Sequence, residues 1–477
     1  MRKTLTIITL SVLAFASSGC GNWLDVNDNP NYPTDVEKSS LLPTVEMRLA
    51  EKVGYDIAMV GSFWSQYIVQ YSSSNQYYTI MTNNLRNSAS WFTSPWTVFY
   101  GQNLPSLYLI IKEYSGDKSK ANFVFEAKSL LAYHLYLLTS LYGDVCYTDS
   151  FQSDTYRTVD VNSNPKFDSA KDIQGIIVKL LEDLRAQDFN EVKTAEATNS
   201  SAASDPVFSG DQDSWKQFVN TLYLKVLMRD FEANKTKIES VLDEDDLLES
   251  DMAFAAYEDK VDKSNPLYES DQRQLNTTKN IRACDDVIKN LDASDGRVAA
   301  YYTMNGKGGY TGTAYGTTGS AATSQLNQSA TMPVYFATAD EAQFLKAEAY
   351  ARLGNAGAAE TAYNAAVNAA FARVKVDGAS ALLGGSYKFD SSASAEAQVE
   401  QIITQKWLSN VLCMPIESWF DLNRTGYPSR GTTITDYSGV LSKGAYPRRF
   451  MYSYYSQAYN TNAPEAVSID EKLWWQK

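Results

Sequence analysis

The amino-acid sequence predicts a mostly α-helical protein, in which tetratricopeptide-type helix pairs form a scaffold and long irregular loops connect the helices. Apolar side chains recur at spacings of three and four over long stretches, as on one face of a helix. Residues 341–373 contain small residues at the positions where two paired helices would cross. Polar loops rich in Gly, Ser, Thr and Asn separate the helices, at 71–94, 305–329 and 377–394. Loops of this length are typically functional or disordered, and the first two contain aromatic residues that disorder alone would not need.

The N-terminus has the pattern of an export signal. The basic pair Arg2–Lys3 precedes an apolar run, residues 5–16, which is shorter than the roughly 20 residues that span a bilayer. Small residues follow, and Cys20 comes directly after Gly19, which resembles a bacterial lipobox. We therefore predict a lipoprotein signal peptide over residues 1–19 and lipidation of Cys20. Ordinary cleavage near Ala16, with a free thiol at Cys20, is the alternative.

Residues 20–37 are predicted to be a lipidated tether, and residues 38–477 a single helical domain. Asn, Asp and Pro dominate the start of the tether and favour turns over helix. A lipid on Cys20 would hold the protein at a membrane surface without crossing it. Residues 25–29 have the acidic spacing of a calcium loop, but Pro30 and Val36 stand where such a loop needs Gly and Glu. No metal site is predicted.

Composition argues against several functions. The chain has 42 basic and 56 acidic residues, a net charge of −14, and no cluster of Lys and Arg, so nucleic acid is not an expected partner. Cys146, Cys284 and Cys413 lack the spacing of a zinc site. They are interpreted as buried free thiols or as one disulfide with a remaining thiol. No cofactor is predicted.

Three helical segments are especially clear. The first, near 119–142, includes His134, the only histidine, on its apolar face. A core position is the simplest interpretation of His134, which leaves no partner for a Ser-His-Asp triad. No HExxH, GxSxG or P-loop pattern appears. Two suitably spaced carboxylates would be enough for a glycoside hydrolase, and with 56 acids this possibility stays open.

The second helical segment covers residues 215–230, and the third is a helix pair that begins after Thr338. Thr338 and Glu341 have the spacing of a capping box, in which the threonine side chain satisfies a backbone N–H at the helix start. Gly354 is placed to close the first helix of the pair, and alanines line the second. The segment from Glu341 to Arg373 is therefore predicted to be a helix–turn–helix of tetratricopeptide type.

A set of short motifs runs in order along the whole chain. They are Cys20–Val26 with Asn29–Pro30, Trp96–Tyr100 with Asn103, Glu126–Val145, Ser214–Asn220 with Met228–Arg229, Asp295–Arg297, Phe344–Gly354, Gln405–Trp407, Glu417–Pro428, Pro447–Arg449 and Trp474–Trp475. Together they resemble the SusD/RagB family of surface lipoproteins from Bacteroidetes-type bacteria. The chain departs from the family pattern at Cys146, where proline is usual. The tryptophans of four motifs, Trp96, Trp215, Trp407 and Trp419, are predicted to be core residues.

The resemblance implies a location, a partner and a function. Family members are lipid-anchored in the cell outer membrane and face the exterior. Each caps a SusC-like, TonB-dependent transporter and delivers a nutrient to it, usually an oligosaccharide. They bind and do not cleave, so the chain is not expected to be an enzyme. A peptide ligand is the first alternative, a surface glycoside hydrolase the second, and a helical-repeat scaffold without a small ligand the third.

The resemblance also implies where a ligand would bind. The family uses loops before its Trp–Tyr–Asn helix and near its Asp–Arg motif, and sugars bind to proteins by stacking on aromatic rings while polar groups orient them. The candidate ligand-binding residues in the corresponding regions are Tyr77, Tyr78, Asn83, Arg86, Trp91, Tyr268, Tyr310 and Tyr315. The alternative interpretation is that these aromatics only fix their own loops to the scaffold.

Overall fold

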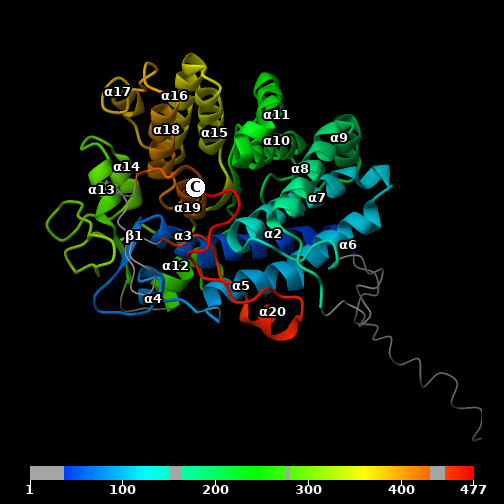
Figure 1. Cartoon of the computed structure of the whole chain (residues 1–477), viewed down its shortest axis with the longest axis horizontal. Coiled ribbons are helices and arrows are strands. Elements are labelled where there is room, and N and C mark those ends of the chain that lie inside the picture. Colours follow the sequence, from blue (N-terminus) through cyan, green and yellow to red (C-terminus); the bar gives the residue numbers. More distant parts are fainter. Residues whose placement is uncertain (1–36, 87, 151–163, 275–278, 430–445) are drawn as a thin grey trace, which may run out of the picture.

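The computed structural model describes residues 37–86, 88–150, 164–274, 279–429 and 446–477. The signal peptide, Cys20 and all of the predicted tether except Glu37 lie outside these residues. The described chain is mostly helical, as predicted, with only short strands (Figure 1). No helix within these ranges is long and apolar enough to cross a bilayer.

The first part of the chain forms a layer of helices along the lower side of Figure 1. Prolines occupy the first turns of α2 and α6, where a missing N–H costs nothing. Two segments, η2 and η3, are π-helical. The elements are η1 (Lys38–Leu41), α2 (Leu42–Glu51), η2 (Lys52–Ile57), α3 (Ala58–Trp64), α4 (Tyr78–Met81), α5 (Ser90–Val98), η3 (Phe99–Asn103), α6 (Leu104–Tyr114), η4 (Lys118–Lys120) and α7 (Ala121–Tyr142).

The later helices form pairs that stand above this layer (Figure 1). Side-chain caps start most of them, because an oxygen of Ser, Thr, Asp or Asn accepts one of the unpaired N–H groups of the first turn. The elements are α8 (Ala170–Ala186), α9 (Phe189–Thr198), α10 (Gln212–Leu227), η5 (Met228–Asp230), α11 (Phe231–Glu244), α15 (Ala339–Arg352), α16 (Ala356–Arg373), α17 (Ala379–Leu383), α18 (Ala395–Ser409) and α19 (Pro415–Thr425).

The predicted helix–turn–helix is confirmed by α15 and α16. The Thr338 hydroxyl oxygen accepts a hydrogen bond from the Glu341 N–H at 3.3 Å, which is the threonine half of the predicted capping box. The Glu341 carboxylate instead pairs with Lys225 at 2.8 Å. Gly354 has φ +78°, a left-handed conformation that glycine adopts without strain. Small buried residues, including Ala347 and Ala359, let the two helices pack closely.

Short strands and irregular segments connect the helices. β1 (Ile68–Gln70) pairs antiparallel with β3 (Ile281–Ala283), and β2 (Met252–Phe254) with β4 (Val334–Ala337). The remaining elements are α12 (Pro266–Tyr268), the π-helix η6 (Glu269–Gln274), α13 (Asp285–Asn290), α14 (Arg297–Tyr301) and α20 (Tyr454–Tyr459). The 71–94 loop therefore contains α4 and the start of α5, and the 377–394 loop contains α17, whereas 305–329 has no helix or named strand.

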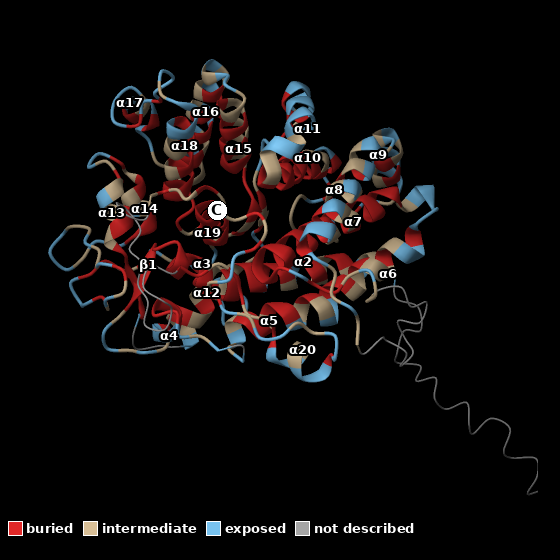
Figure 2. Cartoon of the chain, in the orientation of Figure 1, coloured by how far each residue is buried: buried red, intermediate tan, exposed pale blue. Residues whose placement is uncertain are grey.

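The core confirms the structural roles predicted for the motif residues. Figure 2 shows buried positions along the inner faces of both layers. Trp96, Trp215, Trp407 and Trp419 are buried. His134 is also fully buried, with Nδ1 2.7 Å from the Leu130 carbonyl oxygen. The three thiols outside the N-terminus, Cys146, Cys284 and Cys413, are free and buried.

Candidate functional site

Two of the predicted loops, 71–94 and 305–329, meet beside the β1–β3 ladder. The Ser72 N–H donates to the Gly319 carbonyl at 2.8 Å, and the Gly319 N–H donates to the Gln70 carbonyl at 2.7 Å. A β-carbon at Gly319 would lie 2.8 Å from the Arg282 side chain, which itself lies over the Tyr71 ring at 4.2 Å. Close backbone packing therefore requires glycine at this junction.

The predicted ligand residues differ widely in exposure. Tyr78 is exposed (44%) and Arg86 is exposed, and both are accessible to a ligand. Trp91, Tyr268 and Tyr310 are half-buried. Tyr77, Asn83 and Tyr315 are buried, so their side chains face the protein rather than solvent. The structure thus separates the eight candidates into an exposed, a half-buried and a supporting group.

Trp91 lies within a cluster of rings that includes two residues from outside the predicted loops, Tyr55 and Phe63. Its ring centroid is 5.4 Å from that of Tyr55 on η2 and 6.0 Å from that of Tyr77. Tyr77 is fully buried and also contacts Phe63, at 6.1 Å. Tyr77 therefore supports Trp91 from within the protein, and Tyr55 continues the aromatic surface away from the loop.

A groove of about 620 Å³ begins at Tyr55, and we call it the aromatic groove. Its size is within the range of ligand sites. Aromatic and acidic side chains share its walls, and one exposed methionine borders it. The lining residues are Met47, Glu51, Tyr55, Phe254, Ala256, Tyr257, Glu258, Asp262, Lys263, Ser264, Pro266, Glu269, Ser270 and Gln274.

Two π-helical segments, η2 and η6, both contribute to the groove wall. A π-helix inserts a residue relative to an α-helix, changes the direction of the side chains that follow, and is often found at functional sites. Gly54 allows the close approach of the walls, since a β-carbon there would lie 2.5 Å from Val334 and 2.8 Å from Pro266. The local geometry therefore keeps Tyr55 at the groove surface.

A buried polar cluster behind the groove fixes η2 to α5. The Lys52 ammonium lies 3.1 Å from Asp56 and 2.9 Å from the Ser94 hydroxyl, and it also reaches Glu51, at 2.7 Å. Burial raises the pKa of the Asp56 carboxyl, and the Lys52 charge opposes this shift. Because Ser94 is three residues after Trp91 on α5, the cluster fixes the position of Trp91 relative to Tyr55 on η2.

The groove surface is acidic. Glu51, Glu258 and Asp262 are exposed, and Glu269 lies deeper, 3.4 Å from Arg273. One lysine, Lys263, is among the lining residues. Carboxylates accept hydrogen bonds from hydroxyl groups. Lys52 pairs with Glu51 at 2.7 Å and Lys263 with Glu258 at 3.2 Å, so part of this negative charge is balanced. Aromatic faces beside exposed carboxylates suit a neutral polyhydroxylated ligand better than an anionic one.

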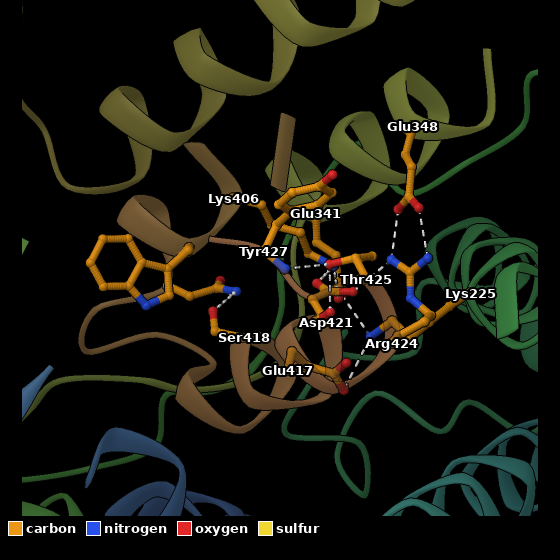
Figure 3. A network of polar contacts seen from close by, with 12 residues as sticks. Lys225, Glu341, Glu348, Lys406, Glu417, Ser418, Asp421, Arg424, Thr425 and Tyr427 are labelled. Carbon is orange, nitrogen blue, oxygen red and sulfur yellow. Dashed lines mark hydrogen bonds and ion pairs between the residues drawn. The ribbon is translucent and has the colours of Figure 1, made fainter. Parts of the chain in front are cut away.

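A second concentration of charge lies inside the scaffold, where α10, α15, α18 and α19 meet (Figure 3). Arg424 makes two contacts with Glu348, at 2.6 and 2.7 Å. Lys406 lies 2.8 Å from Asp421, and further ion pairs join Lys225 to Glu341 at 2.8 Å and to Glu417 at 3.4 Å. We call these seven residues the buried ion network.

The buried ion network is not shaped to bind a nutrient. The cavity beside it has a volume of about 20 Å³, enough for a single water molecule. Its three cations and four carboxylates lie in ion pairs at close range. The strong attraction of Glu348 to Arg424 and Arg352 outweighs burial, which alone would raise its pKa, and lowers the pKa of Glu348 to about 2. The network therefore stabilises the packing of the scaffold helices.

One group of residues within the described ranges has the proximity needed to bind a metal ion: Cys284, Asp285 and Asp286. The Cys284 thiol already donates to an Asp286 carboxylate oxygen at 3.2 Å. Burial raises the pKa of the Cys284 thiol well above its usual value, which disfavours the thiolate that a metal requires. The contact is sufficiently explained as a local hydrogen bond.

Sequence reasoning missed the groove residues Tyr55, Phe254 and Tyr257. Tyr55 belongs to a continuous helical pattern, and Phe254 and Tyr257 lie about 200 residues further along the chain. A signal was present at Gly54, because glycine within a helical pattern often marks a close approach of another segment. Of the predicted residues, Trp91 contacts Tyr55 directly, and Tyr268 lies on α12, between the lining residues Pro266 and Glu269.

The known proteins that this chain resembles are SusD-like. The SusD-like family model, described as starch-binding and associating with the outer membrane, matches residues 30–453. A comparison with curated proteins finds no match.

Solved structures share the fold over nearly their whole length. A chitin-binding SusD homolog from Flavobacterium johnsoniae is 20% identical, with a TM-score of 0.74 over 92% of this chain and 98% of the other. A SusD-like protein from Bacteroides thetaiotaomicron is 21% identical, with a TM-score of 0.73 over 92% and 99%. A SusD homolog from Bacteroides uniformis is 20% identical, with a TM-score of 0.71 over 92% and 99%.

Proposed function

This chain belongs to the SusD-like family, and we propose that it binds a neutral glycan in the aromatic groove and delivers it to a SusC-like, TonB-dependent transporter. The family is described as starch-binding and associating with the outer membrane. One of the similar structures is chitin-binding, and both starch and chitin are neutral polysaccharides. Proteins of this family bind their ligands, so no catalytic role is assigned to the groove carboxylates.

The observation that carries the proposal is the continuous aromatic surface from Trp91 through Tyr55 into the groove. The apolar face of a sugar ring gains free energy when it stacks on an aromatic ring and leaves water. Tyr55 and Trp91 are half-buried and held by their neighbours, so little side-chain entropy is lost when a ligand binds. Exposed Tyr78 and Arg86 lie on the same loop as Trp91 and would extend the contact.

The polar residues of the groove supply orientation. Exposed Glu51 and Asp262 can accept hydrogen bonds from sugar hydroxyls, and Gln274 can both donate and accept them. The excess of carboxylates would repel uronic acids and sulfated sugars. The predicted class of ligand is therefore a neutral oligosaccharide or polysaccharide.

The anchor and the transporter partner complete the proposal. A lipid on Cys20 would hold the protein at the membrane, and residues 20–37 would let the body move relative to a barrel beneath it. Changing Cys20→Ala should shift the protein from the membrane fraction to the soluble fraction. Membrane retention of the variant would refute the anchor. Mild-detergent purification of the native protein should recover a large barrel protein, and its repeated absence would contradict the partnership.

Calorimetric titration tests the binding claim. A form of the chain that starts after Cys20 would be titrated with a panel of neutral oligosaccharides, acidic oligosaccharides and peptides. We expect binding of at least one neutral sugar and loss of that binding in Tyr55→Ala. Binding of peptides alone would favour the peptide-binding alternative, and release of shorter sugars during incubation would favour a hydrolase. No binding by any neutral sugar would refute the proposed function.

A further inference from the structure

The short helix α20 presents an unusual aromatic surface. Its three tyrosines, Tyr454, Tyr455 and Tyr459, are 50%, 57% and 73% exposed. They make up three of the seven large hydrophobic residues that are exposed within the described part of the chain. The Tyr455 and Tyr459 rings are nearly parallel, at 7° with centroids 6.5 Å apart, and Tyr454 lies 5.9 Å from Tyr455. Large apolar groups concentrated on a surface typically mark an interaction site.

The base of α20 is firmly held, although its tyrosines face solvent. Tyr452 is buried, and its ring packs against Phe167 at 5.5 Å and against Trp96 at 6.2 Å. At the other end, the Asn460 side chain donates to the Pro165 carbonyl at 2.8 Å. A rigid base with exposed rings is pre-organised, which lowers the entropy cost of binding. The exposure of the tyrosines therefore does not result from a loosely attached segment.

The α20 segment is also uncharged. No Asp, Glu, Lys or Arg occurs between Phe450 and Pro464, although 21% of the whole chain is charged. Besides its apolar residues the segment contains Tyr, Ser, Asn, Gln and Thr, whose side chains offer rings and neutral hydrogen-bonding groups. Recognition of an anionic glycan or an acidic peptide would call for Arg or Lys. The composition fits a neutral ligand that is rich in hydroxyl groups.

The position of α20 connects it with the aromatic groove. Trp91 lies in the first turn of α5, whereas Tyr452, just before α20, contacts Trp96 near the other end of α5. Figure 1 shows α20 beside α5. A helix of nine residues is roughly 13 Å long. One extended chain of several sugar units could therefore reach from the groove, along α5, to α20.

We propose that α20 is a second glycan-contact surface, which binds the same neutral polysaccharide as the aromatic groove at a more distant part of its chain. This inference rests on the proposed function of the groove. Two linked contacts raise the affinity for a long ligand without changing the affinity for a short one. The protein should therefore distinguish polysaccharides from short oligosaccharides of the same sugar.

Affinity electrophoresis tests this inference. The chain starting after Cys20 would run in native gels that contain soluble starch, glycol chitin, neutral xylan or, as a charged control, polygalacturonate. One of the neutral polysaccharides should retard the parent protein in the gel. The Tyr455→Ala/Tyr459→Ala variant should bind that polysaccharide more weakly than the parent does, by a factor of about five or more. Its affinity for the matching trisaccharide, measured by calorimetry, should stay within about twofold. Tyr455→Phe/Tyr459→Phe, which keeps both rings, should retain most of the polysaccharide affinity.

Tyr55→Ala distinguishes the groove from α20, because it should weaken the binding of both the trisaccharide and the polysaccharide. Polysaccharide binding that survives Tyr55→Ala and is lost in the α20 variant would support α20 and refute the groove. Unchanged retardation of the α20 variant in every neutral gel would overturn the inference. Loss of barrel co-purification, or of binding to phosphatidylethanolamine–phosphatidylglycerol vesicles, with glycan binding intact would also overturn it, in favour of a protein or lipid partner.

Discussion

The buried ion network and the aromatic groove both contain several carboxylates, but those of the network are buried and those of the groove are mostly exposed. In the network, each acid lies close to a lysine or arginine inside the scaffold, and the adjoining cavity holds no more than a water molecule. In the groove, the acids Glu51, Glu258 and Asp262 face solvent beside aromatic rings. One of the ordered sequence motifs, Glu417–Pro428, supplies three residues of the network, Glu417, Asp421 and Arg424, so this motif marks the scaffold rather than the groove.

The largest effect on stability is expected inside the network. Glu348→Ala leaves the Arg424 guanidinium buried without its bidentate partner, and the free energy of unfolding should fall by about 3–5 kcal/mol. Urea denaturation would measure it. The exposed Glu239→Ala is the matched control and should change stability by less than about 0.5 kcal/mol. A loss below 1 kcal/mol for Glu348→Ala would contradict the role assigned to the network.

The same carboxylate predicts an acid limit of stability. The pKa of Glu348 is lowered to about 2 in the folded protein, so its contribution is complete above the unfolded value near 4.5 and is lost as pH falls toward 2. The acid-induced loss of stability should therefore be smaller in Glu348→Gln than in the parent protein between these values. Equal pH profiles for the two proteins would show that Glu348 does not contribute in this way.

His134 gives a comparable effect at higher pH. Burial lowers its pKa to about 4, so the unfolded chain takes up a proton below about 6.5 that the folded protein does not. Stability should fall by about 3 kcal/mol from this residue as pH drops from 6.5 to 4. Comparison of the parent with His134→Gln isolates the contribution from that of other buried acids. Identical slopes of unfolding free energy against pH would contradict a buried neutral histidine.

In the groove, the main effect should be on binding. Tyr55→Ala removes the ring that joins Trp91 to the groove and should weaken glycan affinity by roughly 30-fold, while lowering unfolding free energy by only about 1–2 kcal/mol. Calorimetry and urea denaturation would measure the two quantities. Tyr55→Phe, which keeps the ring, is the matched control. A variant that loses stability and retains affinity would move the ligand site elsewhere.

The smallest expected effect is that of salt. A neutral glycan makes no ion pair with Glu51 or Asp262, so its affinity should change by less than about twofold between 50 mM and 500 mM NaCl. An anionic ligand bound by Arg86 or Lys263 would bind much more weakly at the higher concentration. Titration at both concentrations distinguishes a neutral ligand from a charged one.

The scaffold could be predicted from sequence because its signals are local. Thr338, Glu341 and Gly354 mark the ends of helices within a few residues, and the apolar spacing around His134 defines a buried face. The order of the short motifs along the chain then resembles the SusD/RagB family over most of its length. These features do not depend on knowing which distant segments meet.

The groove could be predicted only in part, because it is formed by segments that are far apart in sequence. Trp91 was found from its loop, but its neighbour Tyr55 lies in a helix, and Tyr257 lies beyond β2. Tyr77 and Tyr78 are adjacent and were equivalent as sequence candidates, yet one is buried and the other exposed. Tertiary packing decides which aromatic rings support the surface and which form it.

Hydrogen exchange followed by mass spectrometry, with and without a glycan that binds, tests the distinction between scaffold and groove most directly. The account predicts that the ligand slows exchange in residues 47–57 and 254–274 and around Trp91, while residues 341–352 and 415–425 of the buried ion network exchange equally in both samples. Protection confined to the network helices, or to the 305–329 loop without the groove, would contradict the account.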